Sequence, residues 1–174
     1  KGALEQALQL AQKTQFTDAN NQARLAVKNF SEALLQVKKI RLGPLVYINM
    51  VNGYKTDVEH LVVAGQALAE AMNQATLYGA SLDSVIANQD TTSFSQLPVV
   101  ERQRILANIY NADATLVNLD KQLEESFANL DSISSLTWFG PLSTRLEELK
   151  DKITTIRTTI GEASPLTRLL PSLL

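Results

Sequence analysis

The longest regular pattern of apolar residues in this chain runs from Tyr47 to Ala75. Its members alternate spacings of four and three residues, as do the apolar positions of helices that pack lengthwise on other helices. The pattern therefore predicts one long helix, and off-stripe residues such as Asp57 and His60 are expected to face water. The stripe consists of Tyr47, Val51, Tyr54, Val58, Leu61, Gly65, Leu68, Met72 and Ala75.

The ends of this helix follow from glycine and proline. Pro44 is a favourable first-turn residue, so we expect the helix to start there. The apolar frame continues past Gly79 to about Ala87, either in one helix or after a restart capped by Ser81. We favour a kink or break at Gly79, because glycine weakens a helix interior. Asn88 to Gln96 is rich in turn-forming residues and is predicted to be a loop.

Four other segments carry apolar stripes with helical spacing. The first covers residues 3–13, and the second has Thr17 as its expected N-cap and stops at Gly43-Pro44. Pro98 and Glu101 open another long helix, and the last long helix is expected to end at Gly161. The stripes are Leu4, Leu8 and Ala11; Ala23, Val27, Phe30, Leu34 and Val37; Ile105, Ile109, Ala112, Leu116, Leu119, Leu123, Phe127 and Leu130; and Leu142, Leu146, Leu149, Ile153, Ile156 and Ile160.

Short corners join these helices, at Gly43-Pro44 and at Gly140-Pro141. Short connections make successive helices antiparallel neighbours. We therefore predict an all-α fold, an elongated antiparallel up-down helical bundle of four long helices plus short terminal helices. Its shared core is expected to bury Val58, Leu61, Leu116, Leu119, Leu149 and Ile153.

Composition limits the function classes that this bundle can serve. A chain of 174 residues with 45% hydrophobic residues can bury the core of one domain. The net charge of -2, with both signs interspersed, gives no footprint for nucleic acid. The absence of cysteine excludes disulfides, thiolate metal sites and thiol nucleophiles. No apolar run approaches the roughly 20 residues that span a bilayer. The chain opens at Lys1-Gly2, and we interpret it as part of a longer protein.

Few side chains are candidates for chemistry. His60, the only histidine, has no second histidine or cysteine to join it, and a solvated or rim position is expected. The adjacent pairs Glu124-Glu125 and Glu147-Glu148 diverge around a helix, whereas acid/base catalysis needs convergence. No carboxylate occupies a stripe position, unlike the inward ligands of di-iron bundles. We predict no enzyme, no metal and no cofactor.

The aromatic residues allow two interpretations. They could line a small-molecule pocket between helices, or they could serve as core and corner packing, which we favour. They are Tyr47, Tyr54, Tyr78, Tyr110, Trp138 and Phe139.

Four stretches resemble a known family. They are Ala23-x-x-x-Val27-x-x-Phe30-x-x-Ala33-Leu34, the Leu42-Gly43-Pro44 corner, Val63 to Ala69, and Pro165 to Leu174. Together they resemble the helical region of a bacterial envelope family called domain of unknown function 4012. The resemblance implies a membrane anchor before these helices and a second domain after them. That domain carries the family's diagnostic Asn- and Arg-containing motif, which these residues do not contain, so no functional residue is carried over.

The carboxy-terminal residues bear most directly on partners. We expect a bundle over residues 1–164 and an apolar tail over 165–174 that leads to a following domain. Ser164-Pro165 can start one short turn from Leu166 to Leu170, but Pro165 and Pro171 are expected to prevent these residues from extending the last long helix regularly. An exposed apolar cluster of this size usually marks an interaction site, and it could drive weak self-association. The candidate interaction patch is Leu166, Leu169, Leu170, Leu173 and Leu174.

The sequence thus favours a non-catalytic, extracytoplasmic helical stalk or interaction module of a larger, membrane-anchored bacterial envelope protein. Its expected partners are the following domain of the same protein or other envelope proteins, and no nucleic acid. The alternative is a ligand-sensing four-helix bundle of the chemoreceptor type. A deep pocket with buried polar side chains would favour the sensor, and a filled core would favour the stalk.

Overall fold

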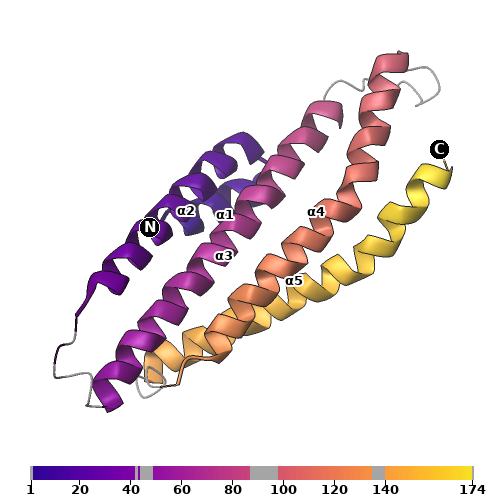
Figure 1. Cartoon of the computed structure of the whole chain (residues 1–174). Helices are drawn as coiled ribbons and strands as arrows, with labels where there is room; N and C mark the ends of the chain where they lie inside the picture. Colours follow the sequence, from indigo (N-terminus) through magenta and orange to yellow (C-terminus); the bar gives the residue numbers. More distant parts are fainter. Residues whose placement is uncertain (1, 42, 44–48, 87–97, 135–139, 174) are drawn as a thin grey trace.

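Five α-helices make up the part of the chain that the structure, a computed structural model, describes: residues 2–41, 43, 49–86, 98–134 and 140–173 (Figure 1). The helices are α1 (Ala3–Gln12), α2 (Phe16–Lys39), α3 (Asn49–Ile86), α4 (Val99–Asp131) and α5 (Gly140–Leu173). Within these ranges there is no strand, and the all-α prediction is confirmed. The predicted start at Pro44 and the loop from Asn88 to Gln96 lie outside the described residues.

The ends of the helices follow local chemistry. Between α1 and α2 the chain turns at Thr14, which adopts a left-handed conformation with φ 58°. α2 begins at Phe16 with Gln15 before it, so the prediction of Thr17 as N-cap was wrong. Lys38 and Lys39 occupy the last turn of α2, where cations complement the helix dipole. α4 follows Pro98 directly and has Glu101 in its first turn, as predicted.

α3 lies between α2 and α4, and each of these helices runs antiparallel to it. Against α2, Asn20 lies at Asn73 and Phe30 lies at Gly65, so residue numbers rise along one helix as they fall along the other. Against α4, the Ser126 hydroxyl donates to the carbonyl of Ala64, and Asn129 lies at His60. These two helices are therefore also antiparallel.

α5 completes the row by packing on α4, where Arg157 meets Asp120 and Lys150 meets Asp131. The main helix contacts therefore follow chain order, and no comparable contact joins α5 to α2 within the described ranges. Figure 1 shows α3, α4 and α5 lying lengthwise beside one another. A single up-down bundle of four antiparallel helices stays a prediction.

Gly79 does not break α3, contrary to expectation, since the helix continues to Ile86. Its role is steric. A Cβ at Gly79 would lie 2.6 Å from Cδ1 of Phe16, well inside van der Waals contact. A Cβ at Gly65 would collide with the ring of Phe30 in the same way. These two glycines therefore let the rings of α2 sit directly on the backbone of α3.

Small residues let the central helices approach closely, and larger ones fill the space between α3, α4 and α5. The predicted core is confirmed at Leu119 and Ile153, which are buried, whereas Val58 is only half-buried. Leu61, Leu116 and Leu149 are also half-buried but pack against the core cluster. The buried apolar side chains of this cluster are Ala64, Ala71, Leu119, Leu123, Leu130, Ile133, Leu146 and Ile153.

Asp57 was expected to face water, yet it is 2% exposed. Because α3 has neighbours on two sides, residues off its main stripe are also covered. The Asp57 carboxylate accepts a hydrogen bond from the backbone N–H of Ser134, at 3.2 Å. That bond compensates part of the cost of burying a charge-bearing group.

α5 continues beyond Gly161 and passes through Pro165 and Pro171, so the predicted helix end was wrong. A proline inside a helix removes one backbone hydrogen bond and crowds the carbonyl four residues earlier. That loss does not end α5, which has 34 residues. The predicted division at residues 164 and 165 falls inside α5.

Candidate functional site

The predicted interaction patch lies on the last turns of α5. Because the backbone is helical there, the positions of Leu166, Leu169, Leu170 and Leu173 follow a spacing of three, one and three along one side of the helix. Leu174 lies outside the described residues. The patch is therefore part of a long helix, and it is not an irregular tail.

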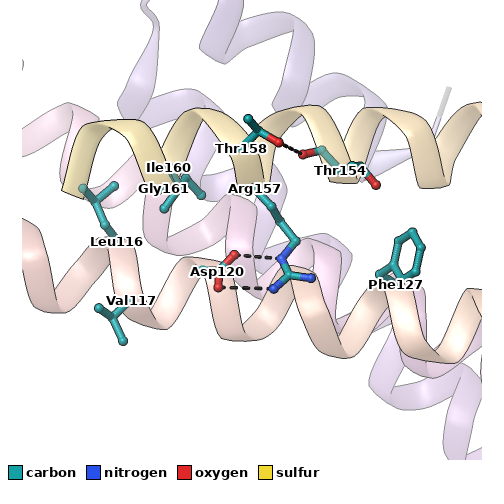
Figure 2. Close-up of a pocket in the computed structure, with 9 residues that line it drawn as sticks. All are labelled: Leu116, Val117, Asp120, Phe127, Thr154, Arg157, Thr158, Ile160 and Gly161. Atoms are coloured by element: carbon teal, nitrogen blue, oxygen red, sulfur yellow. Dashed lines mark hydrogen bonds and ion pairs between the residues drawn. The ribbon is translucent and has the colours of Figure 1, made fainter. Parts of the chain in front are cut away.

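A groove of about 750 Å³ runs between α4 and α5 (Figure 2). Apolar residues of both helices form most of its wall, and one ion pair crosses it. Figure 2 shows Arg157 extending from α5 to Asp120 on α4, with Phe127 further along the groove. The lining residues are Leu116, Val117, Asp120, Phe127, Thr154, Arg157, Thr158, Ile160 and Gly161.

The ion pair in this groove has bidentate geometry. Arg157 donates from Nε to Oδ1 of Asp120 at 2.7 Å and from Nη2 to Oδ2 at 3.3 Å. Glu124 adds a second carboxylate, with Oε2 at 3.7 Å from Nη2. The hydrogen bonds that Arg157 donates to Asp120 raise the pKa of Arg157 and favour its charged form. With about a third of each partner exposed, this pair contributes modestly to stability, on the order of 0.2–1 kcal/mol.

The polar side chains of this groove have partners within the chain. The cation is already matched by Asp120 and Glu124, and the nearby Thr154 and Thr158 hydroxyls donate to carbonyls of their own helix. Among the described residues, no group of three or more His, Cys, Asp or Glu side chains is placed to hold a metal ion.

A second ion-pair cluster lies further along the same interface. Nζ of Lys150 is 3.2 Å from Asp131 on α4 and 3.1 Å from Glu147 on its own helix. Burial lowers the pKa of Lys150, but the hydrogen bonds and charges of Glu147 and Asp131 together outweigh it and raise the pKa. Glu147, one of the adjacent glutamates considered for catalysis, therefore acts as a structural partner.

Polar side chains also connect α3 to its two neighbours. On the α4 side, the buried Ser126 hydroxyl donates to the carbonyl of Ala64 at 3.0 Å. One turn away, Nδ1 of His60 lies 3.0 Å from Oδ1 of Asn129. His60 is half-buried in this interface, in keeping with the expected rim position.

On the α2 side, the amide of Asn20 makes three bonds to α3. It donates to the backbone carbonyl and to Oδ1 of Asn73, both at 2.9 Å, and to the hydroxyl of Thr76 at 3.2 Å. Thr76 is itself buried and donates to the carbonyl of Met72 at 2.8 Å. Buried polar groups with directional partners allow one alignment of α2 on α3.

The described tyrosines do not form one pocket. Tyr110 is 76% exposed, whereas Tyr54 is half-buried. Tyr78 lines a shallower groove of about 520 Å³ between α3 and α4, and burial raises its pKa. Tyr47, Trp138 and Phe139 lie outside the described residues.

Asp120 and Arg157 were not among the residues predicted from the sequence to form a site. Each directly follows a stripe residue, Leu119 on α4 and Ile156 on α5. Opposite charges beside the stripes of two packed helices are the signal that could have found them.

No helix in the described ranges is long and apolar enough to cross a membrane. No protein-family model, curated protein or solved structure matches the chain.

Proposed function

We propose that this chain is a non-catalytic helical stalk or interaction module of a larger, membrane-anchored bacterial envelope protein, built as an elongated antiparallel bundle. The observation that carries the proposal is that hydrogen bonds or ion pairs join each neighbouring pair among the four long helices. Asn20 connects α2 to α3, Ser126 connects α4 to α3, and Arg157 connects α5 to α4. Such ties hold long helices in one alignment, as a spacer of fixed length requires.

The dimensions agree with that role. α3 has 38 residues, which at about 1.5 Å per residue extend roughly 57 Å. Alanines buried along α3 and the leucines around them fill the contacts between helices. The envelope location and the anchored parent protein derive from the resemblance to domain of unknown function 4012.

Rigidity can be measured by electron spin resonance, because a chain without cysteine accepts labels at chosen positions. Cysteines replacing the exposed Lys13 and Asn52 lie near opposite ends of the α2–α3 pair. Since Phe16 lies at Gly79, we expect one narrow distance peak near roughly 40 Å, from the α3 rise between residues 52 and 79.

The matched variant adds Asn20→Ala, which removes the bonds to Asn73 and Thr76 and should broaden that peak. A broad or multiple distribution in the chain without Asn20→Ala would contradict the stalk. The location has its own test in the parent gene. We expect an anchor segment before this chain and a domain with the Asn- and Arg-containing motif after it, and a parent with neither would remove the envelope assignment.

The groove around Arg157 favours a ligand-sensing bundle of the chemoreceptor type as the second candidate. A thermal-shift screen with small carboxylates, amines and amino acids separates the two. The stalk predicts no shift with any compound. Stabilisation by one compound that disappears in Arg157→Gln would favour the sensor.

A further inference from the structure

α4 carries a second heptad stripe on the side that faces away from the core. Val99 and Tyr110 are 58% and 76% exposed, and Val117 is 54% exposed. In Figure 2 Leu116 lies nearer to α5 than Val117 does, and both residues line the groove between α4 and α5. With the positions between them these residues repeat at spacings of four and three, as the buried stripe of the same helix does. We name this set the outer α4 stripe: Val99, Gln103, Leu106, Tyr110, Asp113 and Val117.

The flank of the outer α4 stripe is also apolar. Val100 is 75% exposed, and Ala107 and Ala114 follow it at heptad spacing, both exposed. These three positions are adjacent to the stripe on the side away from α5. A helix face of about three heptads that exposes valine, tyrosine and alanine is typical of a surface that packs on another helix.

We propose that the outer α4 stripe binds the same stripe of a second copy of this chain, with the two α4 helices antiparallel. This interface is separate from the stalk proposal and from the patch at the end of α5.

The order of residues along the stripe selects the antiparallel arrangement. In the antiparallel arrangement Val99 lies against Val117 of the second copy, and Leu106 lies against Tyr110 of the second copy. Each apolar residue then faces another apolar residue. The two polar members also meet, because Gln103 faces Asp113 of the second copy and an amide can donate to a carboxylate. A parallel arrangement would instead oppose Asp113 to itself, and like charges at an interface are unfavourable.

One further feature fits this pairing. Ala107 falls near the two-fold axis, where two small side chains permit close approach of the helices. Because a two-fold axis repeats each contact, every pair occurs twice.

The oligomeric state of the full 174-residue chain tests the proposal. Sedimentation velocity over a range of concentrations should show a monomer–dimer equilibrium. Tyr110→Lys places a charge at the centre of the stripe and should weaken the dimer by about tenfold or more. Leu35→Lys, on α2 and 58% exposed, is the matched control and should leave the dissociation constant unchanged. Both positions are exposed, so both variants should keep the helical circular dichroism of the native chain.

Cysteine cross-linking reports the orientation. Val99 and Val117 are 18 residues apart on α4, roughly 27 Å, so cysteines there cannot bond within one chain. Val99→Cys with Val117→Cys should give a covalent dimer on mild oxidation, and Val99→Cys alone should not. A dimer from the single variant would show parallel packing and overturn the proposal.

Two other results would overturn it. One is a chain that stays monomeric at all concentrations. The other is a dimer that survives Tyr110→Lys but is lost when residues 171–174 are deleted, which would assign association to the end of α5.

Discussion

Replacing Gly65 by alanine tests how α2 docks on α3. In an exposed helix interior the change from glycine to alanine stabilises by about 0.5–1 kcal/mol, because glycine has the greater backbone freedom in the unfolded chain. Gly161 provides that reference. It lies inside α5, and a Cβ there would meet nothing within 4 Å. Gly161→Ala should therefore raise the free energy of unfolding by that amount.

At Gly65 the same substitution meets the ring of Phe30. All three of the nearest atoms belong to that ring, and each is closer than real Cβ contacts allow. The whole ring must therefore move, and overpacking of this kind costs about 1–3 kcal/mol. Set against the gain of up to about 1 kcal/mol, the net effect is a loss of up to roughly 2 kcal/mol. Two identical substitutions should thus have effects of opposite sign.

Urea unfolding followed by circular dichroism measures both variants, with unchanged denaturant slopes as the check that the unfolded state is comparable. The pair Phe30→Leu and Gly65→Ala completes a double-mutant cycle. A smaller side chain at position 30 should remove most of the penalty. If Gly65→Ala instead stabilises as much as Gly161→Ala, the ring does not sit on the glycine and the described packing of α2 is wrong.

The remaining predictions concern the core, the ion pairs, metals and the end of α5. Leu119→Ala should cost about 2–5 kcal/mol of unfolding free energy, because Leu119 is 8% exposed; a loss below about half a kcal/mol would contradict the core. The pKa of Lys150 is higher in the folded chain than in the unfolded chain. Its ion pairs therefore stabilise the fold at pH values below the unfolded-state pKa, and this contribution is lost as the pH rises through the folded-state pKa. Unfolding titrations above about pH 10.5 should show that loss in the native chain and not in Lys150→Met. Chelators should leave the melting temperature unchanged, and a reproducible drop would refute the expectation of no metal. Deleting residues 171–174 should improve solubility and keep the fold, whereas unfolding would make this end of α5 part of the core.

Heptad spacing was sufficient to find the helices but not the faces they bury. The stripe of α4 predicted Leu119, Leu123 and Leu130 as inward positions, and all three are buried. α4 also has two neighbours, but its stripe faces the single core cluster that it shares with both α3 and α5. α3 has neighbours on two sides, and so Asp57 and Thr76 are buried although neither is on its stripe.

The drift of the stripe explains another difference. A strict heptad pattern on a straight α-helix rotates by about 20° per heptad. Gly65 faces Phe30 of α2, but Ala75, ten residues later on the same stripe, is exposed. A pattern read from sequence therefore follows one neighbour over only part of a long helix.

Glycine and proline were the least reliable guides. Gly79 and Pro165 were both expected to interrupt helices, and both lie inside them. Local propensity assigns each a cost of a few kcal/mol at most, and a long packed helix can absorb it. What the sequence could not reveal is the side chain that uses the space, because Phe16 is 63 residues away from Gly79.

Gly65 and Gly79 of α3 also help to fix the alignment that the heptad pattern leaves open. Two helices with repeating stripes can slide by seven residues and still match apolar to apolar, so the stripe alone does not fix their alignment. Phe16 and Phe30 are 14 residues apart, and so are Gly65 and Gly79. In the observed alignment both rings therefore meet a glycine. A slide of one heptad in either direction brings one of the two rings onto Met72, where a side chain occupies the space. The pair of ring-on-glycine contacts thus favours one alignment of α2 on α3, and the bonds of Asn20 to Asn73 and Thr76 are formed only in that alignment.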